Sequence, residues 1–312
     1  MPGCLRPQAS TTFEAYALAL SMTSTSPRHW VAIVGFVLAA GCGAPVTYED
    51  VSYDSRFDAT KLDLYLPDDD AAARPAVMLI HGGAWIAGSK SNMRGMAKRL
   101  ARSGYAAASI DYRLVPEGTY PRMFQDVGCA LAFLQKNSAR YHIDPERIAL
   151  LGYSAGGHLT ALLAVAWDEP DFEPDCASGA PSRPAAAIPG AGVYDFRDND
   201  SDLISDLLGG SREEVPLHYE LASPLAMVDE KKPPFLLIGG GADWFVDTDQ
   251  APLMRDELRA AGGEADLMML AGTGHLIGPS VDPGEQHIGV SLETPEAWLA
   301  IADFLARTVG EP

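Results

Sequence analysis

Residues 147–158 read Arg147-Ile148-Ala149-Leu150-Leu151-Gly152-Tyr153-Ser154-Ala155-Gly156-Gly157-His158. A short apolar run leads directly into the pattern G-x-S-x-G, and an Ala- and Leu-rich stretch follows to about Ala166. This order is typical of a buried strand that turns sharply into a helix and leaves the serine hydroxyl above the sheet. The flanking glycines leave room for that turn. We therefore expect Ser154 to be a nucleophile.

A second glycine-rich turn, His81-Gly82-Gly83-Ala84-Trp85, follows the apolar run Ala76–Ile80. Acyl transfer needs N–H donors aimed at the oxyanion of the tetrahedral intermediate, and one missing donor costs about 2.7–4 kcal/mol. The sequence predicts an oxyanion hole made by the backbone N–H groups of Gly83, Ala84 and Ala155. The imidazole of His81 is expected to hold the loop rather than to react.

The serine needs a base, and the base needs a group that orients it. In α/β-hydrolase folds these partners follow the serine in the order Asp/Glu, then His, each after a later strand. Asp243 follows the apolar run Phe235–Ile238, and His275 follows Ala265–Leu270. We predict that Asp243 orients His275. The weaker candidates are Asp247 and Asp249 for the acid and His287 for the base.

The rest of the chain alternates apolar runs with helical patterns of similar length. Strands are expected at Tyr48–Tyr53, Lys61–Leu66, Tyr105–Ile110 and Ala185–Tyr194, helices at Ser91–Ser103, Phe124–Ala139, Asp249–Ala261 and Pro295–Arg307, and an irregular, partly helical excursion at 196–232. This alternation predicts an α/β fold of the hydrolase type, with a mainly parallel central sheet and helices on both faces. A single catalytic domain is expected over residues 48–312.

Composition excludes several functional classes. The 312 residues carry a formal net charge of −19, which argues against binding nucleic acid or an anionic membrane through charge. The sequence has no H-E-x-x-H pattern and no clustered Cys/His pattern, so no metal is expected. No G-x-G-x-x-G follows the first strand, so a dinucleotide cofactor is not expected, and the cofactor prediction is none.

The segment 1–42 has the pattern of a processing signal. The apolar run Trp30–Ala40 would span roughly 16 Å as a helix, too short for a membrane core of about 30 Å. The run ends in small residues before Cys42, an arrangement that resembles a bacterial lipobox, so lipidation at Cys42 is expected. Residues 43–47 would form a linker. The alternatives are ordinary signal cleavage with a secreted soluble domain, and Met22 as the true start.

Export would place Cys129 and Cys176 in an oxidising compartment. A disulfide between them closes a loop of about 48 residues and would contribute roughly 4 kcal/mol in the chain-entropy description. The alternative is two unpaired thiols, with Cys129 as a small core residue.

These motifs together resemble the esterases related to bifunctional feruloyl and acetylxylan esterases, with the hormone-sensitive-lipase-like carboxylesterases as close relatives. The resemblance runs from about Tyr48 to Val309 and rests on His81–Trp85, Asp111–Leu114, Ile143–Ile148, Gly152–His158, Ser223–Leu225, Asp243 and His275. It implies hydrolysis of a small-molecule or polysaccharide-linked ester, with a small or aromatic acyl group, by Ser154, His275 and Asp243. It also implies that Asp111 and Arg113 are structural.

Two departures from this family affect the expected shape of the substrate. Gly239-Gly240-Gly241 stands where a histidine–glycine pair often precedes the acid, and a long loop, Gly278–Gly289, follows the histidine. An arylformamidase or peptidase-type amide hydrolase with the same triad remains an alternative, as does a non-catalytic binding protein on this scaffold.

Several aromatic and histidine side chains near the motifs have two interpretations. Trp85, Tyr153, Trp244 and Phe245 would line the pocket or pack in the core. His158, one helical turn after the serine, would pack or form a pocket wall.

Overall fold

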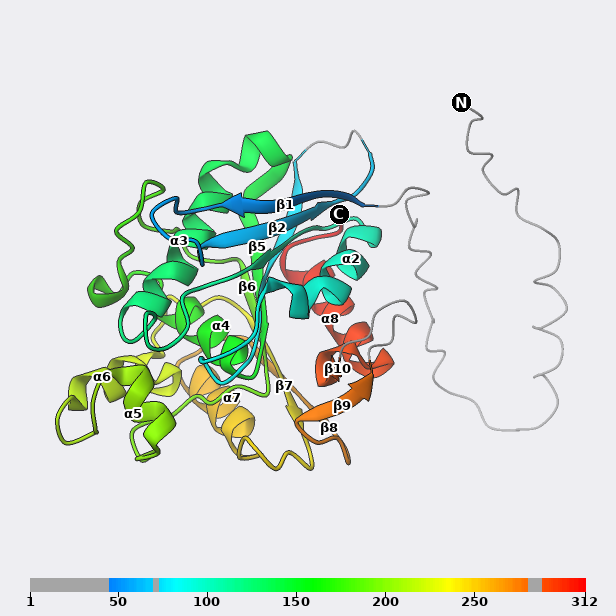
Figure 1. The fold of residues 1–312 in the computed structure, drawn as a ribbon. Coiled ribbons are helices and arrows are strands. Elements are labelled where there is room, and N and C mark those ends of the chain that lie inside the picture. The colour runs from blue at the N-terminus through cyan, green and yellow to red at the C-terminus, as the bar shows by residue number, and fades with distance from the viewer. Residues whose placement is uncertain (1–44, 70–72, 280–287) are drawn as a thin grey trace, which may run out of the picture.

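The computed structural model describes residues 45–69, 73–279 and 288–312. The predicted signal segment 1–42, with Cys42, and His287 lie outside the described residues. An eight-stranded sheet has the order β1-β2-β4-β3-β5-β6-β7-β8 (Figure 1). The strands are β1 Val46–Ser52, β2 Lys61–Leu66, β3 Arg74–Ile80, β4 Ala106–Ile110, β5 Ile143–Tyr153, β6 Ala186–Gly190, β7 Phe235–Gly240 and β8 Ala265–Leu270.

The sheet is antiparallel only at its first edge. Strand β2 pairs antiparallel with both β1 and β4, whereas all neighbours from β4 to β8 are parallel. Strands β9 (Leu276–Pro279) and β10 (Ile288–Val290) form a separate antiparallel pair. Because the parallel strands share one direction, their carboxyl ends meet at one edge of the sheet, where loops from different strands come together.

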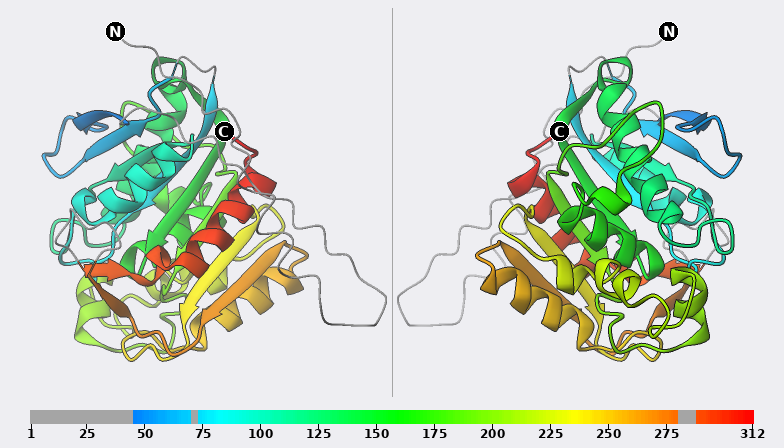
Figure 2. Two further views of the ribbon diagram at one scale, coloured as in Figure 1. Left: turned by 90° about the vertical axis from the view of Figure 1, so that its right-hand side faces the viewer. Right: turned by 90° about the vertical axis from the view of Figure 1, so that its left-hand side faces the viewer.

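Helices cover both faces of the sheet (Figures 1 and 2). Helices α2 and α8 lie on one face, and α3, α4 and α7 lie on the other. Their bounds are α2 Arg94–Arg102, α3 Arg122–Lys136, α4 Ala155–Val165, α7 Gln250–Ala260 and α8 Pro295–Thr308. Short helices follow β6, at α5 Asp202–Leu208 and α6 Pro216–Leu221, and 3-10 turns occur at Lys90–Met93, Ser138–Tyr141, Pro170–Phe172, Pro224–Met227 and Ser291–Glu293.

Alternation along the central strands divides the core into two layers. In β3, Val77 and Leu79 join the layer beneath α2 and α8, whereas Met78 and Ile80 join the layer beneath α3, α4 and α7. All seven residues of β3 are buried because both faces are covered. This packing makes the sheet a rigid base for the loops at its carboxyl edge. None of the helices in the described ranges has the length and apolarity needed to cross a membrane.

The amino-terminal boundary differs slightly from the sequence prediction. Residues 43–47 were expected to form a linker, but Val46 and Thr47 pair with Leu66 and Tyr65 of β2. The extra pairing arises because β2 offers a free edge long enough to accept two more residues of β1.

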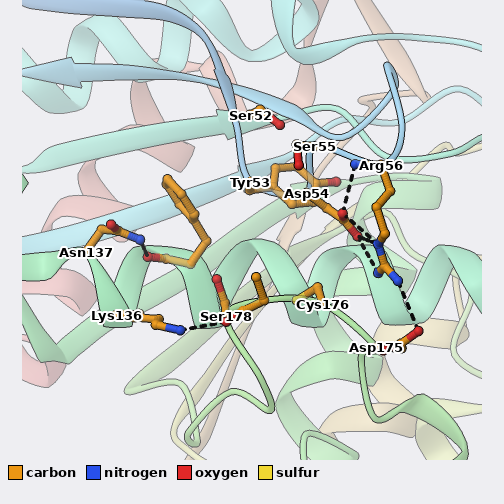
Figure 3. Close-up of a pocket in the computed structure, with 12 residues that line it drawn as sticks. Ser52, Tyr53, Asp54, Ser55, Arg56, Lys136, Asn137, Asp175, Cys176 and Ser178 are labelled. Atoms are coloured by element: carbon orange, nitrogen blue, oxygen red, sulfur yellow. Dashed lines mark hydrogen bonds and ion pairs between the residues drawn. The ribbon is translucent and has the colours of Figure 1, made fainter.

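A disulfide joins Cys129 of α3 to Cys176 in the loop before β6. It lies beside a cavity of about 620 Å³ between that loop, α3 and the turn after β1 (Figure 3). In this cavity the Arg56 guanidinium bridges Asp54 and Asp175, at 2.7 and 3.0 Å. None of the three predicted catalytic side chains lines it.

Candidate active site

Ser154 occupies a sharp turn between β5 and α4. Its φ of +57° lies in the left-handed region that non-glycine residues rarely adopt. A Cβ atom on Gly152 would lie 2.2 Å from the carbonyl oxygen of Gly156, and one on Gly156 would lie 2.1 Å from that of Ile80. Only glycine therefore fits at either position, and the G-x-S-x-G pattern follows from the space that this turn leaves.

The side chains of Ser154, His275 and Asp243 meet at the carboxyl edge of the sheet. His275 Nε2 lies 2.9 Å from Ser154 Oγ, and His275 Nδ1 lies 2.8 Å from Asp243 Oδ2. A carboxylate only accepts hydrogen bonds, so Nδ1 carries the proton and Nε2 is left to accept one from the serine hydroxyl. The three residues come from the ends of β5, β7 and β8, as the sequence predicts.

The carboxylate of Asp243 is fixed by its own loop. Its Oδ1 accepts hydrogen bonds from the backbone N–H groups of Phe245 and Val246, both at 2.9 Å. The side chains of Asp243 and His275 are only 3% and 9% exposed, so little water competes for these bonds. Each oxygen of the carboxylate therefore has a separate role, one toward the loop and one toward the imidazole.

The alternative acids do not take part in this constellation. The Asp247 carboxylate accepts a hydrogen bond from the backbone N–H of Asp249, at 3.0 Å. Asp249 itself stands at the N-cap position of α7. Both residues thus lie at the start of α7, and neither is hydrogen-bonded to the imidazole of His275.

The turn after β3 has three successive residues with positive φ, Gly83 at +124°, Ala84 at +51° and Trp85 at +61°. The Gly83 carbonyl oxygen accepts from the N–H groups of Ile86 and Ala87, at 3.1 and 2.9 Å. The N–H groups of Gly83 and Ala84 have no acceptor within the described ranges. Ala155 opens α4, where a first-turn N–H has no partner within the helix. These three groups remain available to a ligand oxygen.

His81 holds the turn after β3 through hydrogen bonds and ring stacking. Its Nδ1 donates to the Gly82 carbonyl oxygen at 2.7 Å, and its ring stacks on Tyr112 with centroids 4.3 Å apart. The Tyr112 hydroxyl donates to the His81 carbonyl oxygen at 2.8 Å. Burial lowers the pKa of His81 to about 4, so the imidazole is neutral near pH 7. These contacts fit the predicted structural part of His81.

A cavity of about 560 Å³ opens above Ser154. Its walls are mostly apolar and consist of Gly82, Gly83, Ala84, Ile86, Ala87, Gly88, Asn92, Met93, Tyr153, Ser154, Trp244, Phe245 and His275. Trp244 and Phe245 are 75% and 53% exposed and form part of its rim. Of the aromatic residues with two interpretations, Tyr153, Trp244 and Phe245 line this cavity, whereas Trp85 is packed in the core.

Among the wall residues that sequence reasoning missed are the two large apolar ones, Ile86 and Met93. Ile86 directly follows the glycine-rich turn and is 54% exposed, so its position next to the motif was an available signal. Met93 ends the 3-10 turn Lys90–Met93, inside the stretch predicted as a helix, but the helical pattern does not show that its side chain reaches the cavity.

Charged groups of the family motifs lie outside the cavity. Arg113 holds the carboxylate of Asp126 through Nε and Nη2, at 2.8 and 2.6 Å. The Asp111 carboxylate accepts the backbone N–H of Lys90 at 2.6 Å. Both contacts are structural, as expected. In the ranges that the structure describes, no group of three or more metal-binding side chains comes together.

Comparisons with known proteins identify the family of this chain. The sequence model of the BD-FAE family matches residues 62–258. The chain is 36% identical to the probable carboxylic ester hydrolase LipM of Mycobacterium tuberculosis over 224 residues, which are 67% of this chain and 51% of that protein. It is 33% identical to esterase LipC of the same organism over 221 residues, 66% of this chain and 54% of that protein. The chain thus spans about half the length of the curated relatives it matches.

The fold is also similar to that of a solved esterase. A truncated carbohydrate esterase from gut microbiota superposes with a TM-score of 0.71 at 27% identity, covering 85% of this chain and 96% of that one. The family match extends over more than half of the present sequence and includes the serine turn and Asp243. The chain belongs to the BD-FAE family of α/β-hydrolase esterases.

Proposed function

We propose that the protein is a serine carboxylic-ester hydrolase that uses Ser154, His275 and Asp243. The observation that carries the proposal is the continuous hydrogen-bonded arrangement from Asp243 Oδ2 through the imidazole to Ser154 Oγ. It supplies a nucleophile, a base and an orienting acid within direct reach of one another. The relatives named esterases and carboxylic ester hydrolases support the same reaction class.

In the proposed mechanism, Ser154 Oγ attacks the ester carbonyl while His275 Nε2 takes the hydroxyl proton. The N–H groups of Gly83, Ala84 and Ala155 bind the oxyanion of the tetrahedral intermediate. His275 then gives the proton to the leaving alcohol, and an acyl group remains on Ser154. Water repeats the cycle and releases the acid, while Asp243 stays ionised and keeps the imidazole in one tautomer.

The proposed substrates are esters with a small acyl group or a flat aromatic one. A cavity of about 560 Å³ has room for such a group next to Ser154. Apolar side chains of Ile86, Met93, Trp244 and Phe245 would contact it. The alcohol is a small molecule or part of a polysaccharide, in line with the neighbour named a carbohydrate esterase.

The experiment is a kinetic panel of aryl esters with acyl chains of increasing length, together with acetylated xylan, methyl ferulate and a matched aryl anilide. We expect hydrolysis of short or aromatic acyl esters, a steep fall for long chains, and slow cleavage of the anilide. Ser154→Ala should remove activity to within about 10³–10⁴-fold of the uncatalysed rate. Faster cleavage of the amide would instead favour an amide hydrolase, and activity that survives in Ser154→Ala would favour a scaffold without this mechanism.

We also propose that the domain is exported and held at the cell envelope through Cys42, which lies outside the described residues. The disulfide between Cys129 and Cys176 supports export, because such bonds persist mainly in oxidising compartments.

A further inference from the structure

His158 lies on α4, four residues after the nucleophile, and is fully buried. Its backbone N–H donates to the Ser154 carbonyl oxygen at 3.0 Å. The ring does not line the cavity above Ser154, and it packs against Trp85, Phe124 and Phe196. The proposed mechanism does not use His158. Because buried polar atoms are almost always hydrogen-bonded, each of its two ring nitrogens should have a specific partner.

Both ring nitrogens of His158 have one partner each. The indole N–H of Trp85 donates to Nδ1 at 3.2 Å, and Nε2 lies 2.8 Å from the carbonyl oxygen of Ala222. An indole nitrogen can only donate and a carbonyl oxygen can only accept, so the tautomer is fixed with Nδ1 bare and Nε2 protonated. Burial lowers the pKa of His158 to about 4, which keeps the ring neutral at ordinary pH.

The partner of Nδ1 belongs to the oxyanion turn. Trp85 directly follows Ala84, and both residues have positive φ, at +61° and +51°. Such conformations are costly for non-glycine residues and persist only where the surroundings hold them. Two hydrogen bonds hold Trp85: its carbonyl oxygen accepts from the N–H of Val115 at 3.0 Å, and its buried indole N–H donates to His158.

From these contacts we propose that His158 is a positioning residue, which holds the oxyanion turn against the nucleophile helix through the Trp85 indole. The same ring ties α4 to Ala222, next to the C-terminus of α6, so one imidazole links the serine helix, the turn and the excursion after β6. The inference rests on the proposed function, because the turn matters for rate only if its N–H groups bind an oxyanion.

Two substitutions at His158 separate its two bonds. In His158→Asn, the Oδ1 atom can occupy the place of Nδ1 and accept from the Trp85 indole. This variant has no donor for the carbonyl oxygen of Ala222. In His158→Gln, the Nε2 atom can occupy the place of the imidazole Nε2 and donate to the carbonyl oxygen of Ala222. This variant has no acceptor for the Trp85 indole N–H. Both variants lose packing and one buried hydrogen bond, so their losses of stability should be similar.

The variants should differ in kcat. Misplaced oxyanion donors act on the transition state, and an error of about 1 Å can cost up to 10²-fold, so His158→Gln should lose about 10-fold to 100-fold in kcat at nearly constant KM. His158→Asn should stay within about threefold of the wild type, because the contact to Trp85 is kept. Equal kcat values for the two variants would overturn the proposal and leave His158 a packing residue.

A second pair of variants tests the indole itself. Trp85→Phe keeps most of the ring and removes the N–H, so it should lower kcat as His158→Gln does, and the double variant should lose little more. Trp167→Phe is the matched control, because the buried Trp167 indole nitrogen has no hydrogen-bond partner within the described ranges. Additive losses in the double variant would contradict a shared contact.

An aryl phosphonate that labels Ser154 keeps the two proposals apart, because its adduct also places an oxygen in the oxyanion hole. Failure of the wild type to react would contradict the proposed function, and the inference with it. Rapid labelling of the wild type, with His158→Gln labelled equally fast, would contradict only the inference. We expect labelling of His158→Gln and Trp85→Phe to be slowed by the same factor as their kcat.

Discussion

The two oxygens of Asp243 have different partners, and this division predicts what its amide would do. In Asp243→Asn the amide oxygen can keep the contacts to the N–H groups of Phe245 and Val246, while the NH₂ group faces His275 Nδ1. The imidazole then carries its proton on Nε2 and cannot take the serine proton. We expect kcat to fall by about 10³–10⁴-fold with little change in KM and with the fold retained.

Asp247→Asn is the control for this substitution, because Asp247 is an exposed carboxylate four residues further along the same loop. Steady-state kinetics with one aryl acetate, together with circular dichroism of each variant, checks both. A loss of less than tenfold in kcat for Asp243→Asn, or an equal loss in the control, would contradict the proposal that Asp243 orients His275.

Other residues at this scale show where sequence reasoning succeeds and where it fails. Ser154, Asp243 and His275 each follow an apolar strand in a glycine-containing turn, so local pattern and chain order identify them. The partners of His158 could not be identified in this way. Trp85 and Ala222 lie 73 and 64 residues from it, and no local pattern records a contact that arises only when these two distant segments pack against α4.

At the scale of elements, the predicted helices and strands were correct wherever periodicity was strong, and they differ at the ends. Strand β5 begins at Ile143, before the apolar run that starts after Arg147, because Ile143 also pairs with Arg74 of β3. The strand expected to reach Tyr194 ends at Gly190, where Ala191 has a φ of +44°. Apolar character alone does not reveal such a change of backbone direction.

The bond between Cys129 and Cys176 connects α3 to the loop before β6. The same loop is also anchored by the buried ring of Phe172 and by an exposed ion pair of Asp175 with Arg56, at 3.0 Å. Exposed ion pairs contribute little. Replacing both cysteines with alanine should lower the free energy of unfolding by about 2–5 kcal/mol. Activity at 25 °C should be unchanged, because no residue of this region lines the cavity above Ser154.

Urea denaturation of the wild type with and without a reductant, next to the double alanine variant, measures this effect. Reduction should bring the wild type to the stability of the variant and leave the variant unaffected. A variant as stable as the oxidised wild type would show that the rest of the fold holds the loop, and that the bond contributes no stability.

At the scale of the whole molecule, alternation of strands and helices is enough to predict a parallel sheet covered on both faces. It does not give the order of the strands. Strand β4 inserts between β2 and β3, so β3 pairs with β4 and β5, and the antiparallel β1 and β2 lie at one edge. Only pairing between distant segments decides this order, and the sequence contains no local signal for it.

Burial of His81 and His158 makes global stability depend on pH. The pKa of His81 and of His158 is about 4 in the folded protein, lowered by burial from 6.5. Between these values the unfolded chain binds protons that the folded chain does not. Stability is therefore complete above about pH 6.5 and falls toward pH 4, by up to about 1.4 kcal/mol per pH unit for each histidine.

Several carboxylates also have a shifted pKa and therefore change how steeply stability depends on pH. Burial raises the pKa of Asp111 and Asp126 above 3.8, so the folded protein takes up these protons at a higher pH than the unfolded chain does, and part of the loss is offset. The pKa of Asp54 is lowered by hydrogen bonds from Arg56, and its contribution is lost only at still lower pH. The contribution of one histidine to the slope between pH 6 and 5 is therefore measured by comparison with a variant that lacks it.

His158→Asn removes one of these titrating groups and should make that slope shallower by about 1.4 kcal/mol per pH unit, although the variant is less stable at pH 7. His142→Asn is the control, because His142 is exposed and its left-handed backbone, with a φ of +55°, suits asparagine. Urea denaturation at pH 7.5, 6, 5 and 4.5 compares the three proteins by slope rather than by absolute stability. Parallel curves for His158→Asn and the wild type would mean that His158 takes up its proton in the folded state, which is incompatible with a neutral ring that accepts from Trp85.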